Sequence, residues 1–206
     1  MKAMRVERSP EVCGRTQAFE ALRIGADGGV ADAVLSIDGA PPKVGEGNVL
    51  VDQVACRYVP HVVTVTVGQA LEVHDGDDLL HNVHAIWTAP EAATWFNLAT
   101  PSKGFSVRRP VARAGLARLL CDAGHVWMSG WVHAFAHDLH AVSGEDGSFR
   151  IYGVPVGART LRLWHEGWRV VGDDGGRPRF SEPIERTQAV DVAPDSETRV
   201  DLDLAE

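Results

Sequence analysis

Short runs in which apolar and polar residues alternate dominate the chain, and turn-forming residues separate them. Residues 63–67 alternate valine with threonine, and residues 71–74 alternate apolar with polar side chains. Because successive side chains of a strand point to opposite faces, a period of two predicts half-buried β-strands. Gly68-Gln69 lies between the two runs, which predicts that they pair as a β-hairpin.

The same alternation predicts strands along the rest of the chain. Residues 113–120 fit a short helix or a strand, and we favour a strand that leads into Cys121. No long stretch has the period of an amphipathic helix. The other predicted strands are residues 33–37, 81–87, 148–152, 160–165, 190–192 and 200–204. Many short strands at this spacing predict an all-β protein built from sandwiches.

Composition and charge narrow the function classes. The chain has 206 residues and a formal net charge of −8, so it lacks the basic surface that nucleic-acid binding requires. No apolar run approaches the length of a membrane span. Residues 1–8 lack the apolar core of a signal peptide, so either the protein stays in the cytoplasm or a signal peptide has been removed.

One segment concentrates metal-binding chemistry. It places the thiol of Cys121, the imidazole of His125 and the thioether of Met128 close together in the sequence. With one more histidine, these donors form the ligand set of a mononuclear copper centre. His81 supplies that histidine, because its parity on the strand 81–87 points it toward a sandwich interior. Zinc is the rival metal, but a thioether ligand favours copper.

Neighbouring residues limit the alternatives. A binuclear copper centre would need a second cysteine at the position of Ala117. Asn82 could hydrogen-bond across to the cysteine loop and hold the two ligand segments together. A nucleophile pair of Cys121 and His125 would lack an evident orienting residue and would leave Met128 unexplained.

The chain has three cysteines, and Cys13 and Cys56 remain once Cys121 is assigned to the metal. They either form a disulfide, which would imply an oxidising compartment, or they are two unrelated buried thiols. The sequence leaves both interpretations open.

Other polar residues allow further sites. His61 could be an additional ligand or a gate to solvent, and His84 should point away from His81. A second metal site or a docking surface would draw on His133, His137, His140 and His165. Histidines scattered over strands are usually satisfied by backbone and water, so we do not expect this site. The acidic loop 75–78 is shorter than a calcium-binding loop, and we expect a solvated turn.

The order of these segments resembles the cupredoxin superfamily over residues 48–131. More narrowly, it resembles plastocyanin-like bacterial proteins of the methylamine-utilisation type. The segments that carry the resemblance are Cys13-Gly14, Tyr58 to His61, residues 63–73, His81 to His84, Cys121 to Met128 and Trp164-His165-Glu166. The resemblance implies copper bound by His81, Cys121, His125 and Met128, with His61 and His84 as candidate additional ligands. It also implies export to the periplasm and electron exchange with a redox partner protein.

The flanking sequence resembles the carboxypeptidase regulatory-like module, a small transthyretin-like β-sandwich. Residues 141–149 and 154–161 follow its turn-and-strand pattern, and residues 29–37 are similar to its early strand. Together the resemblances imply a cupredoxin-like Greek-key sandwich of residues 48–131. That sandwich would be inserted into a second, smaller one built from residues 1–47 and 132–206.

The function that follows is a one-electron copper carrier rather than an enzyme. Cys121 would provide the covalent electron path, His81 and His125 the equatorial ligands, and Met128 the weak axial one. Two alternatives stay open. One is a copper enzyme with an open coordination position, and the other is a copper-handling or partner-binding module without a redox role.

Overall fold

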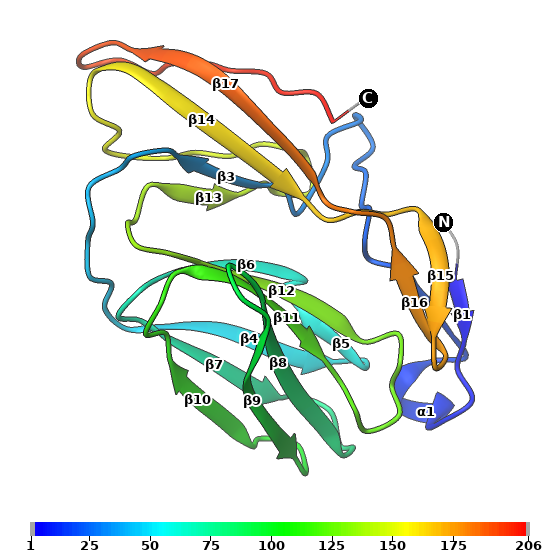
Figure 1. The fold of residues 1–206 in the computed structure, drawn as a ribbon. Coiled ribbons are helices and arrows are strands. Elements are labelled where there is room, and N and C mark those ends of the chain that lie inside the picture. The colour runs from blue at the N-terminus through cyan, green and yellow to red at the C-terminus, as the bar shows by residue number, and fades with distance from the viewer. Residues whose placement is uncertain (1–2, 205–206) are drawn as a thin grey trace. The chain divides into compact units, whose positions relative to one another are not determined.

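The computed structural model describes residues 3–204, which form β-strands and one very short helix (Figure 1). The elements are β1 (Ala3–Arg5), α1 (Pro10–Cys13), β2 (Thr16–Ala18), β3 (Val34–Ile37), β4 (Asn48–Val54), β5 (Arg57–Val59), β6 (Val62–Thr66), β7 (Ala70–Asp75), β8 (His81–Ala89), β9 (Ala93–Thr100), β10 (Ser106–Pro110), β11 (Gly115–Leu120), β12 (Ser129–Phe135), β13 (His140–Val142), β14 (Gly157–His165), β15 (Val170–Asp174), β16 (Arg177–Phe180) and β17 (Ile184–Val192). The predicted all-β class is confirmed. No helix within the described residues is long and apolar enough to cross a membrane.

The chain divides into two compact units that interleave along the sequence. The first unit contains the residues up to Glu20 together with Pro42–Asp138 and Val170–Arg179. The second contains Ala21–Pro41, Leu139–Arg169 and the chain from Phe180 onward. The sequence had suggested residues 48–131 for the first unit and residues 1–47 plus 132–206 for the second, so the boundaries differ. The N-terminal segment joins the first unit through a disulfide, and the β15–β16 hairpin joins it through hydrogen bonds of Arg177.

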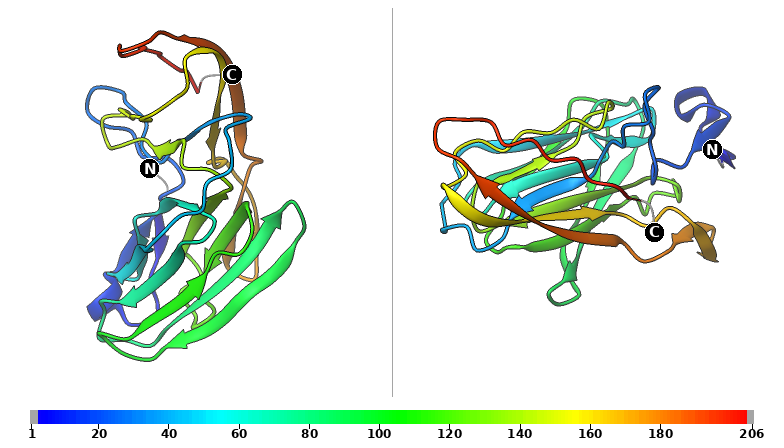
Figure 2. Two further views of the ribbon diagram at one scale, coloured as in Figure 1. Left: turned by 90° about the vertical axis from the view of Figure 1, so that its left-hand side faces the viewer. Right: turned by 90° about the horizontal axis from the view of Figure 1, so that it is seen from above.

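The first unit is built on two sheets, which Figure 2 shows from two further directions. One sheet has the strand order β10-β7-β4-β5 and the other the order β6-β12-β11-β8-β9. The pairs β4·β7 and β6·β12 are parallel, and the other pairs in the two sheets are antiparallel. Both sheets contribute side chains to one buried apolar core, including Leu71, Val73, Val83, Leu119 and Val132.

The predicted hairpin between residues 63–67 and 71–74 is wrong, because β6 and β7 belong to different sheets. β6 pairs with β12, and β7 pairs with β4 and β10. Gly68 carries the chain from one sheet to the other with a φ of 103°. A Cβ there would lie 2.6 Å from Val44 Cγ1, so this close approach requires glycine. Alternation and a turn signal located the strands but not their partners.

The predicted alternation of residues 81–87 is confirmed in β8. His81, Val83, Ala85 and Trp87 are buried, whereas the residues between them are partly exposed. β8 pairs antiparallel with β11, and His84 lies opposite Leu120. The start of β8 and the residue after β11 therefore lie at the same end of the sheet. This register brings His81 toward Cys121.

The second unit contains one sheet of order β13-β3-β14-β17. Leu35, Ile37, Leu161 and Leu163 form its core. The strands predicted at 148–152 and 200–204 are wrong, because these segments have no strand ladder. The apolar residues that gave these segments their alternating pattern instead pack against the core as irregular chain, namely Phe149, Ile151, Val200, Leu202 and Leu204.

A matched pair of leucines tests the core of the first unit. Leu71 on β7 is 0% exposed, and Leu50 on the neighbouring β4 is 51% exposed. We expect Leu71→Ala to lower the free energy of unfolding by about 2–5 kcal/mol, because it removes buried contacts and leaves a cavity. Leu50→Ala should change it by less than about 0.5 kcal/mol. Urea denaturation measures both, and equal losses would contradict the assigned sheet faces.

Candidate metal centre

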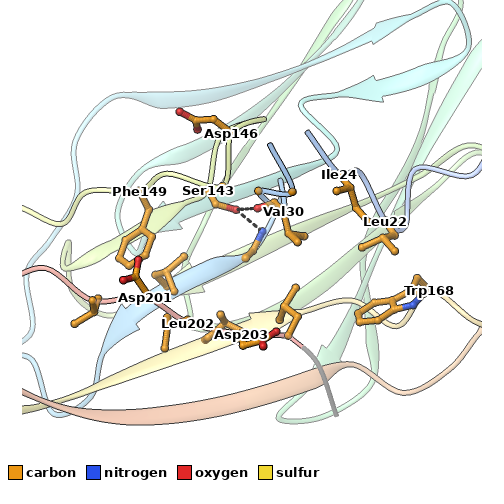
Figure 3. Close-up of a pocket in the computed structure, with 18 residues that line it drawn as sticks. Leu22, Ile24, Val30, Ser143, Asp146, Phe149, Trp168, Asp201, Leu202 and Asp203 are labelled. Carbon is orange, nitrogen blue, oxygen red and sulfur yellow. Dashed lines mark hydrogen bonds between the residues drawn. The ribbon is translucent and has the colours of Figure 1, made fainter. Parts of the chain in front are cut away.

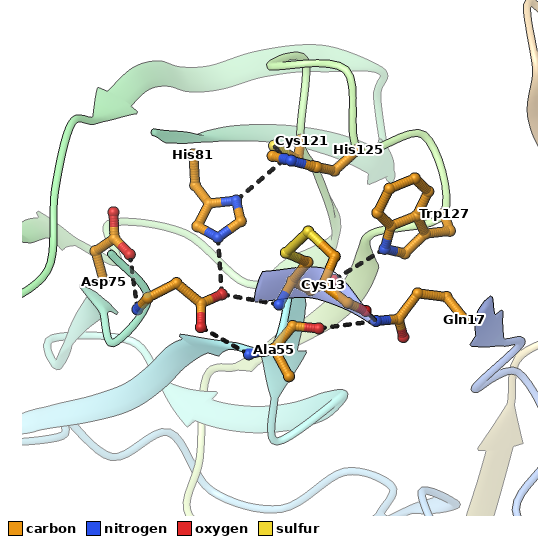
Figure 4. The surroundings of a disulfide bond; sticks show 10 residues. Cys13, Gln17, Ala55, Asp75, His81, Cys121, His125 and Trp127 are labelled. Atoms are coloured by element: carbon orange, nitrogen blue, oxygen red, sulfur yellow. Dashed lines mark hydrogen bonds and ion pairs between the residues drawn. A yellow bond between two sulfur atoms is a disulfide. The ribbon is translucent and has the colours of Figure 1, made fainter. Parts of the chain in front are cut away.

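Three side chains that the sequence singled out converge at one end of the five-stranded sheet (Figure 4). His81 begins β8, Cys121 follows β11, and His125 lies in the loop after Cys121. The two Nδ1 atoms of His81 and His125 are 3.2 Å apart, and Cys121 Sγ lies 3.5 Å from His125 Nδ1. The exposed fractions of the three residues are 0%, 0% and 1%.

Hydrogen bonds hold the two ligand segments together. Asn82 Oδ1 accepts from the backbone N–H of Asp122 at 3.1 Å, which confirms the predicted bond across to the cysteine loop. The Tyr58 hydroxyl lies within hydrogen-bonding distance of the carbonyl oxygens of Asn82 and Leu120, at 2.8 and 3.0 Å. Burial raises the pKa of Tyr58, so this residue stays a neutral donor. The geometry of the cluster is thus fixed from both strands.

Asp77 sets the orientation of His81. Its Oδ2 lies 2.9 Å from His81 Nε2, and its carboxylate also accepts from the backbone N–H groups of Ala55 and Cys56 at 2.8 Å each. A carboxylate accepts, so His81 carries its proton on Nε2 and presents a lone pair at Nδ1. The interpretation of the acidic loop as a solvated turn is wrong, because Asp75 is 0% and Asp77 8% exposed.

Burial sets the protonation states of the cluster. Burial lowers the pKa of His125 to about 4, with smaller contributions from the charges of His81 and Arg8, so His125 is neutral at pH 7. Burial raises the pKa of the Cys121 thiol, and backbone hydrogen bonds and Arg177 partly oppose this effect. A neutral His125 protonated on Nδ1 can donate to the lone pair of His81 Nδ1 at 3.2 Å, and a metal ion between the rings would replace that proton.

A disulfide covers the other side of His125. Cys13 and Cys56 are bonded, so of the two interpretations left open by the sequence the disulfide is correct. Their sulfur atoms and a ring nitrogen of His125 all lie within 4.8 Å of one another. Trp127 packs against this small core and donates from Nε1 to Cys56 O at 3.1 Å. His125 Nε2 is buried and has no hydrogen-bond partner among residues 3–204.

The remaining candidate ligands are Met128, His61 and His84. Met128 is 0% exposed, belongs to the same core as Cys121 and donates its backbone N–H to His125 O at 2.9 Å. His61 is buried, and its Nδ1 lies 3.0 Å from Ser129 O. His84 lies outside the cluster, with Nδ1 2.8 Å from Asp122 Oδ2.

The histidines considered for a second site lie apart from this cluster. Within the part of the chain that the structure describes, the groups of three potential ligands draw only on Cys13, Cys56, Asp77, Cys121 and the histidines at 81 and 125. None of these groups includes His133, His137, His140 or His165.

A separate cavity of about 410 Å³ lies within the second unit (Figure 3). Its lining includes Phe149, Trp168 and Leu202. The hydroxyl of Ser143 is already used, because it donates to Val30 O at 2.7 Å and accepts from Ala33 N–H at 3.0 Å. Asp146, Asp201 and Asp203 also line the cavity, but none of the groups of three potential metal ligands among residues 3–204 includes them. No sequence pattern had indicated this cavity.

No protein-family model matches the chain, and no curated protein matches it. Among solved structures, the chain is similar to amicyanin from Paracoccus versutus, with 17% identity, a TM-score of 0.37, and coverage of 49% of this chain and 97% of that one. It is similar to a purple cupredoxin from Nitrosopumilus maritimus, with 18% identity, a TM-score of 0.37, and coverage of 42% and 98%.

A third similarity is to the Cu-containing nitrite reductase from Thermus scotoductus SA-01, with 20% identity and a TM-score of 0.35. It covers 47% of this chain and 24% of that one, so the chain spans about a quarter of the reductase. These similarities leave half or more of the chain unmatched. At such identities and TM-scores they carry no inference about function, which rests on the site itself.

The disulfide predicts a measurable protection of His125. Removing it with Cys13→Ser plus Cys56→Ser should lower the free energy of unfolding by about 4 kcal/mol, the chain-entropy value for the 43-residue separation. The same double variant should make the His125 imidazole more reactive toward an acylating reagent, because the disulfide no longer packs beside its ring. Denaturation and mass mapping of modified histidines measure the two effects.

His165 serves as the internal control for that reagent. It is 1% exposed, lies in the second unit, and has no part in the disulfide. Its reactivity should stay low in both proteins. If His125 is equally protected with and without the disulfide, the covering role is wrong.

Proposed function

We propose that the first unit is a cupredoxin-like domain that holds one copper ion between His81, Cys121 and His125, and that the protein carries single electrons. Met128 is proposed as the weak axial ligand. The observation that carries the proposal is the convergence of two imidazole Nδ1 atoms and a thiol in one buried cluster, with Asp77 already selecting the ligand tautomer of His81.

The donor set fits copper. A thiolate with two imidazoles and a soft thioether suits a copper site, and the ion supplies a one-electron couple when it is bound. Asp77 and Asn82 hold the ligand segments in place before the metal arrives. A fixed, buried site changes little when the charge changes, which favours rapid electron transfer.

Burial supports a carrier over an enzyme. An enzyme with an open coordination position needs a route for its substrate to the metal. His81, Cys121 and His125 are at most 1% exposed, and the disulfide and Trp127 cover one side. A copper enzyme is therefore the second candidate function. Copper handling without a redox role is the third, and copper titration distinguishes the three.

Location and partners follow from the same proposal. A structural disulfide persists in oxidising compartments, which supports an exported, periplasmic protein. The partner is then a soluble redox protein, and the net charge of −8 favours one with a basic surface.

We further propose that the second unit is a carboxypeptidase regulatory-like sandwich into which the copper domain is inserted. Its segments at 21–41, 139–169 and from 180 onward flank those of the first unit along the chain. β3 comes from the segment that resembles the early strand of that module, and it pairs with β13 and β14, which supports a single module built from both flanking segments.

Copper binding is tested directly on the apoprotein. Addition of one equivalent of Cu(II) should produce an intense thiolate-to-copper absorption band and a mononuclear paramagnetic spectrum. Cys121→Ser should abolish the band, because it removes the thiolate. His74→Gln is the matched control, since His74 on β7 pairs with Asp52 on β4 and is not a member of the cluster.

The outcomes separate the functions. A reversible one-electron couple with an intense band supports the carrier. A pale site with exchangeable water supports the enzyme, and tight Cu(I) retention without a stable Cu(II) form supports copper handling. A band that persists in Cys121→Ser would contradict the ligand assignment altogether.

The affinity for copper should rise with pH. Cys121 is protonated in the apoprotein because burial raises its pKa, and His125 is neutral above about pH 4. Binding therefore releases the thiol proton, and the apparent affinity should rise about tenfold per pH unit between about pH 7 and pH 8. Competition with a chelator of known pH dependence measures the slope, and a flat profile would contradict thiolate ligation.

A further inference from the structure

Arg177 reaches the metal loop from a distant part of the sequence. Its Nη2 donates to Cys121 O at 2.9 Å, and its Nη1 donates to Val126 O at 3.2 Å and Met128 O at 3.3 Å. These carbonyls belong to the first residue, the middle and the last residue of the loop that carries the candidate ligands. One guanidinium therefore ties both ends of that loop together.

The environment of this guanidinium is unusual for an arginine. Its side chain is only 16% exposed, and the carboxylate paired with it is that of Asp122, with Oδ1 3.8 Å away. A largely buried cation costs desolvation free energy, which carbonyl dipoles and one longer ion pair have to offset. The planar fork of arginine holds its donors on separate nitrogens at fixed positions, whereas the three donors of lysine share one nitrogen.

The hairpin that carries Arg177 is itself well defined. β15 and β16 pair around Gly175 and Gly176, which both have positive φ, and Asp173 Oδ1 accepts from Gly176 N–H at 2.9 Å. The hairpin belongs to the first unit although the sequence on both sides of it belongs to the second. Through Arg177, the hairpin bonds to the loop from Cys121 to Met128, and it does not extend the sheet that contains β14 and β17.

We propose that Arg177 is a positioning residue that clamps the loop from Cys121 to Met128 and places a fixed positive charge beside the metal centre. This inference rests on the proposed copper function for its electrostatic part alone. A positive charge disfavours the more highly charged oxidised ion, so Arg177 raises the reduction potential of the bound metal. The clamp acts in the apoprotein as well.

The clamp is tested first without metal. In apo Arg177→Met, backbone amides of residues 121–128 should exchange with solvent at least about tenfold faster, because three carbonyl contacts are lost. Arg177→Lys should also exchange faster, since the single nitrogen of lysine cannot occupy the positions of both Nη atoms. Arg179→Met is the matched control at an exposed position of the same hairpin, and it should leave the exchange unchanged.

The electrostatic part is tested on the copper-loaded proteins by voltammetry. In Arg177→Met the preference for Cu(I) over Cu(II) should fall about tenfold, equivalent to about 59 mV for one electron. Arg177→Lys keeps the charge and should stay near the wild-type potential, although its loop exchanges faster. Arg179→Met should match the wild type in both measurements.

Each result decides one part. Exchange at the wild-type rate in Arg177→Met overturns the clamp, and a wild-type potential in that variant overturns the electrostatic role. If Arg177→Met does not fold, Arg177→Lys still tests the clamp, and wild-type exchange in that variant overturns it. If the wild-type protein binds no copper, the proposed function fails while the apoprotein exchange still decides the clamp.

Discussion

Two imidazole nitrogens that face each other at 3.2 Å in a buried site are the constraint on which the candidate metal centre depends. Asp77 sets the tautomer of His81, because it accepts the hydrogen bond from Nε2 and leaves the lone pair on Nδ1, the atom that faces His125. The same carboxylate is held by the backbone of Ala55 and Cys56. The orientation of a candidate ligand is therefore linked through one side chain to the turn that carries the disulfide.

Local patterns in the sequence predicted the members of the cluster well. The alternation of β8 indicated the inward direction of His81, and the short spacing from Cys121 to His125 indicated a ligand loop. The bond from Asn82 to that loop was also predicted, because an amide next to an inward histidine at a strand end can reach across. These features depend on residues that lie near one another in the sequence or on strand parity alone.

Other features that depend on distant partners could not be predicted, because no local pattern indicates those partners. Asp77 looked like part of a solvated acidic turn, because nothing local shows that Cys56 and its neighbours bury it. β6 and β7 looked like a hairpin, because alternation identifies strands but not the sheet each one joins. Arg177 carried no signal at all, since a single arginine in a polar hairpin resembles any exposed charge.

The hydrogen bonds of Arg177 and the disulfide of Cys13 have a consequence for modularity. A fragment cut at the obvious edges, Pro42–Asp138, would keep both sheets and every candidate ligand of the copper loop. It would nevertheless lose the guanidinium that closes that loop and the half-cystine that shields His125. The His81–Cys121–His125 cluster therefore cannot be excised with its surroundings intact as one continuous fragment, and transplanting it into another scaffold requires three separate stretches of this polypeptide.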